Sequence, residues 1–146
     1  MKPYFSIIIP TLNEEAYIAK LLNCLKKQVV KNFEVILVDG NSQDATCRIA
    51  RTFKRFFPLR IVKLPKGNLS LQKNTGGLKA RASTLIFFYA DIQVKSNFTK
   101  LAQASVEKRK AFVFIPHVYP IEKNEYPEVH AVMNLFNQLV NRKSVV

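Results

Sequence analysis

The stretch FEVILVDGNSQDAT, residues 33–46, decides the fold because it joins a strand, a turn and the start of a helix. Its first half is a run of apolar and β-branched residues, typical of a strand buried on both faces of a parallel sheet. The run ends at Asp39, and Gly40 then permits a tight turn. Ser42 can cap the following helix, and Asp44 suits its positive N-terminus. Ligands of open α/β sheets bind beyond the carboxyl ends of the strands, so Asp39 is a candidate site residue, with a simple turn former as the alternative.

Strand and helix alternate on both sides of this stretch. Short apolar runs predict further strands at residues 5–9, 59–64, 85–89 and 111–115. Apolar residues at helical spacing predict helices near residues 14–29, 45–56, 70–82, 96–110 and 127–141. This order predicts an α/β, Rossmann-like fold with a mostly parallel, doubly wound sheet of about five strands flanked by helices.

The helix boundaries can also be predicted. Thr11 and Glu14 have the spacing of a capping box, so we expect the first helix to start there, with Val29 on its buried face. Ser70 is the expected cap of the third helix. The residues expected to face inward from the third helix are Leu71, Leu78 and Ala82, and those from the fourth are Phe98, Leu101, Ala102 and Val106.

Length and composition favour one cytoplasmic domain. A chain of 146 residues with 48% hydrophobic content can bury one core, so residues 1–146 are expected to form a single domain. No apolar run reaches the length of about 18 residues that a membrane span needs, and the first ten residues lack the pattern of a signal peptide. Cys24 and Cys47 are expected to be reduced and structural.

The net charge of +13 attracts phosphates, nucleic acid or an anionic membrane without distinguishing them. The basic residues are spread over several predicted helices and are not interleaved with aromatic residues, so nucleic acid is an unlikely partner. The acidic residues carry more information, because Asp39, Asp44 and Asp91 all fall at strand ends or helix starts. That placement points to a site that holds a cation. Residues 127–141 have a broad apolar face, for which we expect either peripheral membrane contact or self-association.

Four pieces of the sequence resemble the N-terminal half of family 2 glycosyltransferases, which have the GT-A fold. They are FSIIIPTLNEEAYI, FEVILVDGNSQDAT, LSLQKNTGGLKA and LIFFYAD, and together they span most of residues 5–91. In that family the loop after the first strand and the aspartate after the second hold the nucleoside of a sugar nucleotide. The resemblance assigns this role to Pro10, Thr11, Asn13, Glu14 and Asp39.

The family's later acidic motif, usually Asp-x-Asp, binds a divalent metal on the diphosphate and falls here on residues 89–91. Asp91 is therefore the expected ligand of Mg²⁺ or Mn²⁺, ions that prefer oxygen ligands and need only one or two carboxylates beside phosphates and water. Tyr89 departs from the usual first aspartate. Lys66 and Lys73 could hold phosphate as point charges, and a solvated helix face is the alternative for Lys73.

The resemblance implies a glycosyltransferase that moves a sugar, with inversion, from a nucleotide-diphosphate sugar to an unidentified acceptor, which could be lipid-linked, protein or saccharide. Metal-assisted departure of the diphosphate would drive the transfer. We expect the acceptor-binding part to be absent from this chain, so no catalytic base is assigned. The alternative from another class is a non-catalytic nucleotide-binding or assembly domain, and a nucleic-acid-binding module ranks below both.

Overall fold

A computed structural model of the chain describes residues 2–109, 113 and 114. Its elements are β1 (Phe5–Thr11), α1 (Ile18–Lys26), β2 (Phe33–Asp39), α2 (Thr46–Arg51), the 3₁₀ helix η1 (Thr52–Arg55), β3 (Leu59–Lys63), α3 (Leu69–Leu78), β4 (Thr84–Phe87), α4 (Phe98–Arg109) and β5 (Val113–Phe114). These strands form one parallel sheet in the order β3-β2-β1-β4-β5. The predicted doubly wound α/β fold is confirmed.

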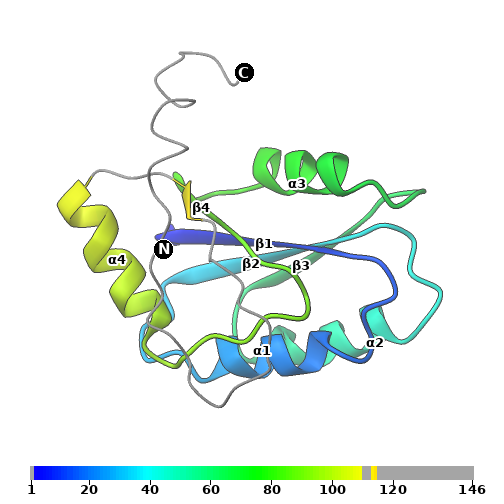
Figure 1. The fold of residues 1–146 in the computed structure, drawn as a ribbon, viewed down its shortest axis with the longest axis horizontal. Helices are drawn as coiled ribbons and strands as arrows, with labels where there is room; N and C mark the ends of the chain where they lie inside the picture. The colour runs from blue at the N-terminus through cyan, green and yellow to red at the C-terminus, as the bar shows by residue number, and fades with distance from the viewer. Residues whose placement is uncertain (1, 110–112, 115–146) are drawn as a thin grey trace.

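Helices cover both faces of the sheet, which explains why β1 and β2 are buried along their whole length. Helices α1 and α2 lie along one face, and α3 lies on the other (Figure 1). Because successive side chains of a strand point to opposite faces, Ile7 of β1 belongs to the core under α1, whereas Ile8 belongs to the core under α3.

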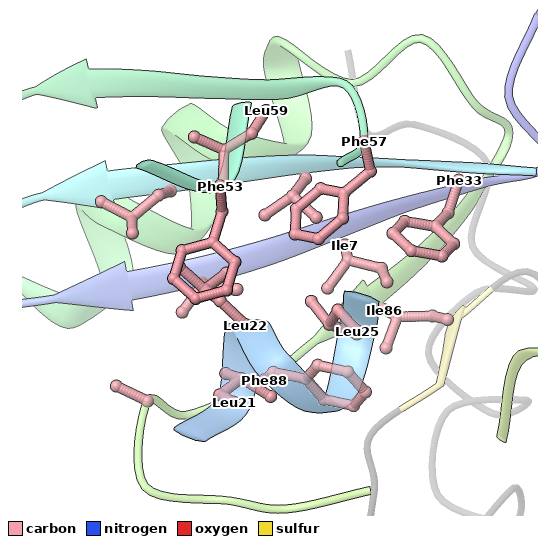
Figure 2. Packing of buried hydrophobic residues seen from close by; sticks show 14 of the residues in the cluster. Ile7, Leu21, Leu22, Leu25, Phe33, Phe53, Phe57, Leu59, Ile86 and Phe88 are labelled. Carbon is pink, nitrogen blue, oxygen red and sulfur yellow. The ribbon is translucent and has the colours of Figure 1, made fainter. Parts of the chain in front are cut away.

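The larger core lies between the sheet and the α1 side of the molecule. Leu21, Leu22 and Leu25 of α1 share this cluster with strand residues such as Ile7 and with Phe53 of η1 (Figure 2). These three leucines are fully buried, as their helical spacing predicts. Cys24 and Cys47 are free thiols, as expected.

The smaller core packs α3 closely on the sheet. A Cβ added at Gly76 would overlap the Cγ2 of Ile8, so only glycine lets the helix approach this strand. A Cβ at Gly77 would lie 3.6 Å from Leu85, an ordinary contact. Close packing on the sheet therefore requires glycine at position 76 but not at position 77.

A buried carboxylate joins three strands and the loop before β4. Glu34 Oε1 accepts hydrogen bonds from Ser6 Oγ at 2.7 Å and from the Arg81 backbone N–H at 2.7 Å. Its Oε2 accepts from Arg81 Nε at 2.9 Å and from Arg60 at 3.3 Å. Burial alone would raise the pKa of Glu34, but these hydrogen bonds and the charge of Arg60 outweigh it and hold the pKa below its usual value.

The expected start of the first helix was wrong. Thr11 stays in β1, paired in register with Asp39, and α1 begins only at Ile18 without a side-chain cap. The helix also ends earlier than expected, and Val29 is 63% exposed. The late start follows because the backbone N–H groups of residues 13–15 already donate to side chains in the loop after β2 and at the start of α2.

The rotation of the third helix was also predicted wrongly. Asn68, and not Ser70, caps α3, because its side-chain oxygen accepts a hydrogen bond from the Leu71 N–H at 2.9 Å. Leu71 and Leu78 are 50% and 79% exposed, and the buried residues of α3 are Gln72 and Gly76. Ala82 is buried, but it lies in the loop after α3. The close approach to Ile8 fixes this rotation, which the apolar pattern does not reveal.

In α4, Phe98 and Ala102 are buried as predicted, whereas Leu101 is 53% exposed. No helix within the described residues is long and apolar enough to cross a membrane. The helix predicted at residues 127–141, with its expected membrane or self-association surface, lies outside the described residues.

Candidate functional site

A pocket of about 500 Å³ lies beyond the carboxyl ends of β1 and β4. The chain builds β2 and β3 on one side of β1 and then crosses to place β4 on the other side. Such a reversal of strand order opens a crevice between the two neighbouring strands, where open α/β sheets bind their ligands. The lining residues are Pro10, Thr11, Leu12, Glu14, Gly67, Asn68, Leu69, Gln72, Tyr89, Ala90 and Asp91.

Hydrogen bonds between the loops after β1 and β2 hold one wall of the pocket. Asn13 donates its backbone N–H to Ser42 Oγ and accepts at Oδ1 from the Gln43 N–H, both at 2.9 Å. The Glu14 N–H donates to Thr46 Oγ1 at 2.7 Å, which fixes the backbone of Glu14 at the pocket. Asn13 has a φ of 56°, a left-handed conformation that asparagine tolerates better than most residues. Asn13 therefore supports the loops behind the pocket and is not one of the residues that line it.

The expected cap of α2 takes part in the same loop contact. The Ser42 hydroxyl accepts from the Asn13 backbone instead of capping the helix, which begins at Thr46. Asp44 Oδ1 accepts from the Thr46 N–H at 2.9 Å, and its Oδ2 accepts from the Glu15 N–H at 3.0 Å. Asp44 therefore holds the loop after β1 against the start of α2 and is not part of the pocket lining.

Two carboxylates line the pocket from opposite sides of the strand reversal. Glu14 follows β1, and Asp91 follows β4. Burial raises the pKa of Glu14, and the negative charges of Asp91 and Asp44 raise it further. Glu14 is therefore a carboxylate whose charge is disfavoured until a cation is near.

The N-terminus of α3 also meets the pocket. Asn68 caps the helix, and both Asn68 and Leu69 belong to the lining. The first amide groups of a helix have no partner within the helix, and the helix dipole makes this end positive. The pocket thus combines the positive end of a helix with a pair of carboxylates.

Gln72 is a lining residue that the sequence did not reveal. Its Nε2 donates to the backbone oxygens of Thr11 and Val38, both at 2.8 Å, and the residue is 4% exposed. The signal was present in the i, i+4 spacing of Gln72 and Gly76, which places a polar and a small residue on one helix face. The neighbouring Leu71 and its apolar pattern concealed it.

Asp39 stands at the end of β2 as predicted, but it has no exposed surface. Its carboxylate accepts hydrogen bonds from the Ser42 N–H at 3.1 Å and from the Thr11 hydroxyl at 3.5 Å. Because this last hydrogen bond joins it to Thr11, which lines the pocket, Asp39 lies behind Thr11. Asp39 also neighbours Cys47: burial raises the pKa of the Cys47 thiol, and Asp39 raises it further.

Tyr89 lines the pocket at the position where the resemblance led us to expect an aspartate. Its hydroxyl accepts a hydrogen bond from Lys73 Nζ at 3.1 Å. Lys73 is thus beside the pocket through Tyr89 without lining it, and Lys66 is exposed in the loop before α3. Of the expected site residues, those that line the pocket are Pro10, Thr11, Glu14 and Asp91, and those that lie beside it are Asn13, Asp39 and Lys73.

The donor set fits a divalent ion that takes further ligands from a substrate. Glu14 and Asp91 offer carboxylate oxygens to the pocket, and no group of three or more His, Cys, Asp or Glu side chains within the described part of the chain could hold a metal ion by itself. Mg²⁺ is usually bound by one or two carboxylates together with substrate phosphates and water. The positive N-terminal end of α3 lines the same pocket.

The chain is similar to two bacterial glycosyltransferases along most of its sequence. EpsJ of Bacillus subtilis, described as an uncharacterized glycosyltransferase, is 34% identical over 97 residues, which are 66% of this chain and 28% of EpsJ. TarS of Staphylococcus aureus, a poly(ribitol-phosphate) beta-N-acetylglucosaminyltransferase, is 30% identical over 115 residues, which are 76% of this chain and 20% of TarS. The chain therefore spans less than a third of the length of either relative.

Solved structures share the same fold. The crystal structure of S. aureus TarS 1-349 in complex with UDP has a TM-score of 0.73 and 26% identity, covering 85% of this chain and 38% of that chain. The mannosyltransferase PcManGT from Pyrobaculum calidifontis in complex with GDP-Man and Mn²⁺ has a TM-score of 0.64 and 25% identity, covering 72% of this chain and 32% of that chain. A family model described as Glycosyl transferase family 2 matches residues 6–144. The chain therefore belongs to glycosyl transferase family 2 and has the Rossmann-like GT-A fold of that family.

Proposed function

We propose that the pocket binds a nucleotide-diphosphate sugar and that the chain is the donor-binding domain of a glycosyltransferase. One observation carries the proposal: a helix N-terminus and two carboxylates face the same pocket at the reversal of strand order. A volume of about 500 Å³ lies within the usual range for small-molecule sites. The relatives support the same ligand class, since TarS has been solved with UDP and with UDP-GlcNAc, and PcManGT with GDP-Man.

The diphosphate would lie at the N-terminus of α3. Helix N-termini bind phosphate because their backbone N–H groups point outward and the dipole favours negative charge. Asn68 holds the Leu71 N–H, so the amides of Leu69 and Ser70 are the ones left for a ligand. Lys73, held at the pocket by Tyr89, adds a positive charge at the same side.

Glu14 and Asp91 would hold Mg²⁺ or Mn²⁺ against that diphosphate. When bound, such an ion acts as a Lewis acid and stabilises the charge on the departing diphosphate. In this chain both carboxylates line one pocket, burial and the charge of Asp91 disfavour the charged form of Glu14, and Tyr89 stands where a third carboxylate would otherwise lie. The presence of Mn²⁺ in the PcManGT structure supports the choice of ion.

The nucleoside would lie against Pro10 and Thr11. Direct contact between Asp39 and a base would require the turn at residues 40–42 to move, because Asp39 is fully buried. As described, Asp39 orients the Thr11 hydroxyl and holds the Ser42 backbone, so it supports the nucleoside wall from behind. Asn13 does the same through the loop after β2.

Calorimetry with UDP and GDP, each with and without Mn²⁺, tests this proposal. We expect a nucleoside diphosphate to bind and Mn²⁺ to strengthen its binding. Asp91→Asn should remove the strengthening, whereas Glu107→Gln, at an exposed position on α4, should leave it unchanged. If neither nucleotide binds, the proposal fails, and if Mn²⁺ has no effect on the unmutated chain, the metal assignment fails.

A second candidate is a donor-binding domain without turnover, which Tyr89 favours because a hydroxyl paired with Lys73 replaces a carboxylate ligand. Release of UDP from UDP-sugars, measured for this chain and for Tyr89→Asp, separates the two. Turnover by the unmutated chain supports the transferase. Nucleotide binding without turnover, with turnover gained by Tyr89→Asp, supports the second candidate.

A further inference from the structure

The fold gathers basic residues that look scattered in the sequence onto one side of the molecule. Helices α1 and α2 lie side by side along one face of the sheet, with α3 on the opposite face (Figure 1). Residues 18–27 contribute three lysines, residues 46–55 contribute four lysines and arginines, and neither segment contains an acidic residue. We call these seven residues the basic layer: Lys20, Lys26, Lys27, Arg48, Arg51, Lys54 and Arg55. By contrast, α3 contains one basic residue, Lys73.

The basic layer is not neutralised by nearby carboxylates. Within the described residues the salt bridges are made by Glu34, with Arg60 and Arg81, so the seven cations have no carboxylate partner there. Glu34 points to the α3 face of the sheet, because it alternates along β2 with residues of the α1 core. Asp39 is buried against Cys47 of α2, and Glu15 and Asp44 accept hydrogen bonds from backbone N–H groups at the start of α2. The layer therefore presents a field of one sign to the solvent.

Contacts between the elements bring these cations together. Lys26 Nζ lies 4.1 Å from the centre of the Phe56 ring, and the Arg55 guanidinium carbon lies 4.8 Å from the same centre. The positive side chains of Lys26, in α1, and Arg55, in η1, therefore lie next to each other at the Phe56 ring. At the other end of α1, the half-exposed Tyr17 lies beneath Lys20, whose Nζ is 5.8 Å from its ring centre.

We propose that the basic layer is an attachment surface for an anionic lipid bilayer, with phospholipid headgroups as its ligands. Clusters of four to eight lysines and arginines on a helical surface are typical of binding to anionic lipids, and a tyrosine beside them suits the membrane interface. Nucleic acid fits less well, since single-stranded binding uses exposed aromatic platforms, whereas Phe53 and Phe57 are buried and Phe56 is covered by cations. None of the seven residues lines the pocket, so attachment leaves the pocket free.

Sedimentation of the full chain with lipid vesicles tests this surface. The probes are vesicles of phosphatidylcholine alone and vesicles that also contain phosphatidylserine. We expect binding only to the second kind, and weaker binding as salt increases, because salt screens exposed charges. Equal binding to both kinds of vesicle, or binding to neither, would overturn the proposal.

Two variants with the same change in net charge show whether the layer itself is responsible. Lys20→Glu with Arg48→Glu reverses two exposed charges in the first turns of α1 and α2, where glutamate suits the helix dipole. Lys66→Glu with Lys79→Glu reverses two exposed charges before and after α3. We expect the first variant to lose at least about tenfold in vesicle affinity, and the second to lose much less.

Thermal melting establishes that both variants are folded. Equal losses in the two variants would show that net charge alone drives binding, and an undiminished affinity in the first would place the attachment elsewhere. Either result refutes the assignment. Tighter binding of a single-stranded oligonucleotide than of vesicles, lost in the first variant alone, would replace the lipid partner by nucleic acid.

Discussion

Alanine substitution at Gly76 and at Gly77 should change stability in opposite directions, although the two glycines are adjacent in α3. Alanine is more favourable than glycine in a helix by about 0.5–1 kcal/mol. At Gly77 the added Cβ would meet Leu85 at 3.6 Å, an ordinary contact, so Gly77→Ala should stabilise the chain by up to about 1 kcal/mol. At Gly76 the added Cβ would overlap Ile8, which is fully buried on the central strand.

Overpacking of a core site of this kind typically costs about 1–3 kcal/mol. Because both variants gain a similar helix propensity, the difference between their unfolding free energies isolates the clash with Ile8 and should be about 1–3 kcal/mol. Urea denaturation measures this difference directly, and a difference of 1 kcal/mol corresponds to a shift in melting temperature of about 3 °C for a chain of this size. If both variants are stabilised equally, α3 does not pack on Ile8 as described.

A double-mutant cycle assigns the effect to Ile8. Ile8→Ala alone should destabilise the chain by about 2–5 kcal/mol, since it leaves a cavity beside Gly76. In that background Gly76→Ala should be neutral or stabilising, because the new methyl group enters the space that Ile8 occupied. An equal cost of Gly76→Ala in both backgrounds would show that the strain arises elsewhere in α3.

Three further predictions concern polar side chains of the core and the pocket. The pKa of Glu34 is lowered in the folded chain, so its ionised form stabilises the fold above the ordinary value of about 4.3, and this contribution is lost as pH falls through the folded pKa. Glu34→Gln should therefore flatten the acid side of a stability–pH curve and cost about 1–3 kcal/mol at neutral pH, and an unchanged curve would contradict this. Asp91→Asn should lower the pKa of Glu14, measured by NMR titration of its carboxyl carbon, whereas an unchanged pKa would show that the two carboxylates do not interact. Gln72→Met should cost about 1–3 kcal/mol, because two buried hydrogen bonds are lost, and wild-type melting would refute this role.

The sheet could be predicted because each strand is indicated by the composition of a short, continuous segment of sequence. Runs such as residues 35–38 are apolar on both faces, and only a strand covered by helices on both sides needs that composition. The edge of the sheet that carries the pocket was predictable for the same reason, since Asp39 and Asp91 follow such runs directly. Thr11 and Glu14 were placed correctly at that edge even though the helix after them begins later than expected.

The parts that could not be predicted depend on contacts between distant segments. The rotation of α3 is fixed by the space that Gly76 leaves for Ile8, and this contact outweighs the apolar pattern of Leu71 and Leu78. The burial of Asp39 depends on the Ser42 backbone closing over it. Likewise, the basic layer exists only because α1, α2 and η1 cover the same face of the sheet.

The geometry of the pocket rests on a side chain that is not among the expected ligands. The loops after β2 and β3 approach each other at Gly40 and Gly67, where a Cβ on Gly40 would lie 2.6 Å from the Gly67 Cα. Neither glycine has a positive φ, so glycine is required at position 40 by lack of space and not by the expected tight turn. Next to this junction, Gln72 donates to backbone carbonyl groups near the ends of two strands, those of Thr11 in β1 and Val38 in β2. One side chain of α3 therefore fixes the distance between the helix N-terminus, where a diphosphate is proposed to lie, and the end of β1, where the nucleoside is proposed to lie. The affinity for a donor that spans those two points depends on how α3 packs on the sheet. The stability of that packing and the affinity for the donor should therefore change together.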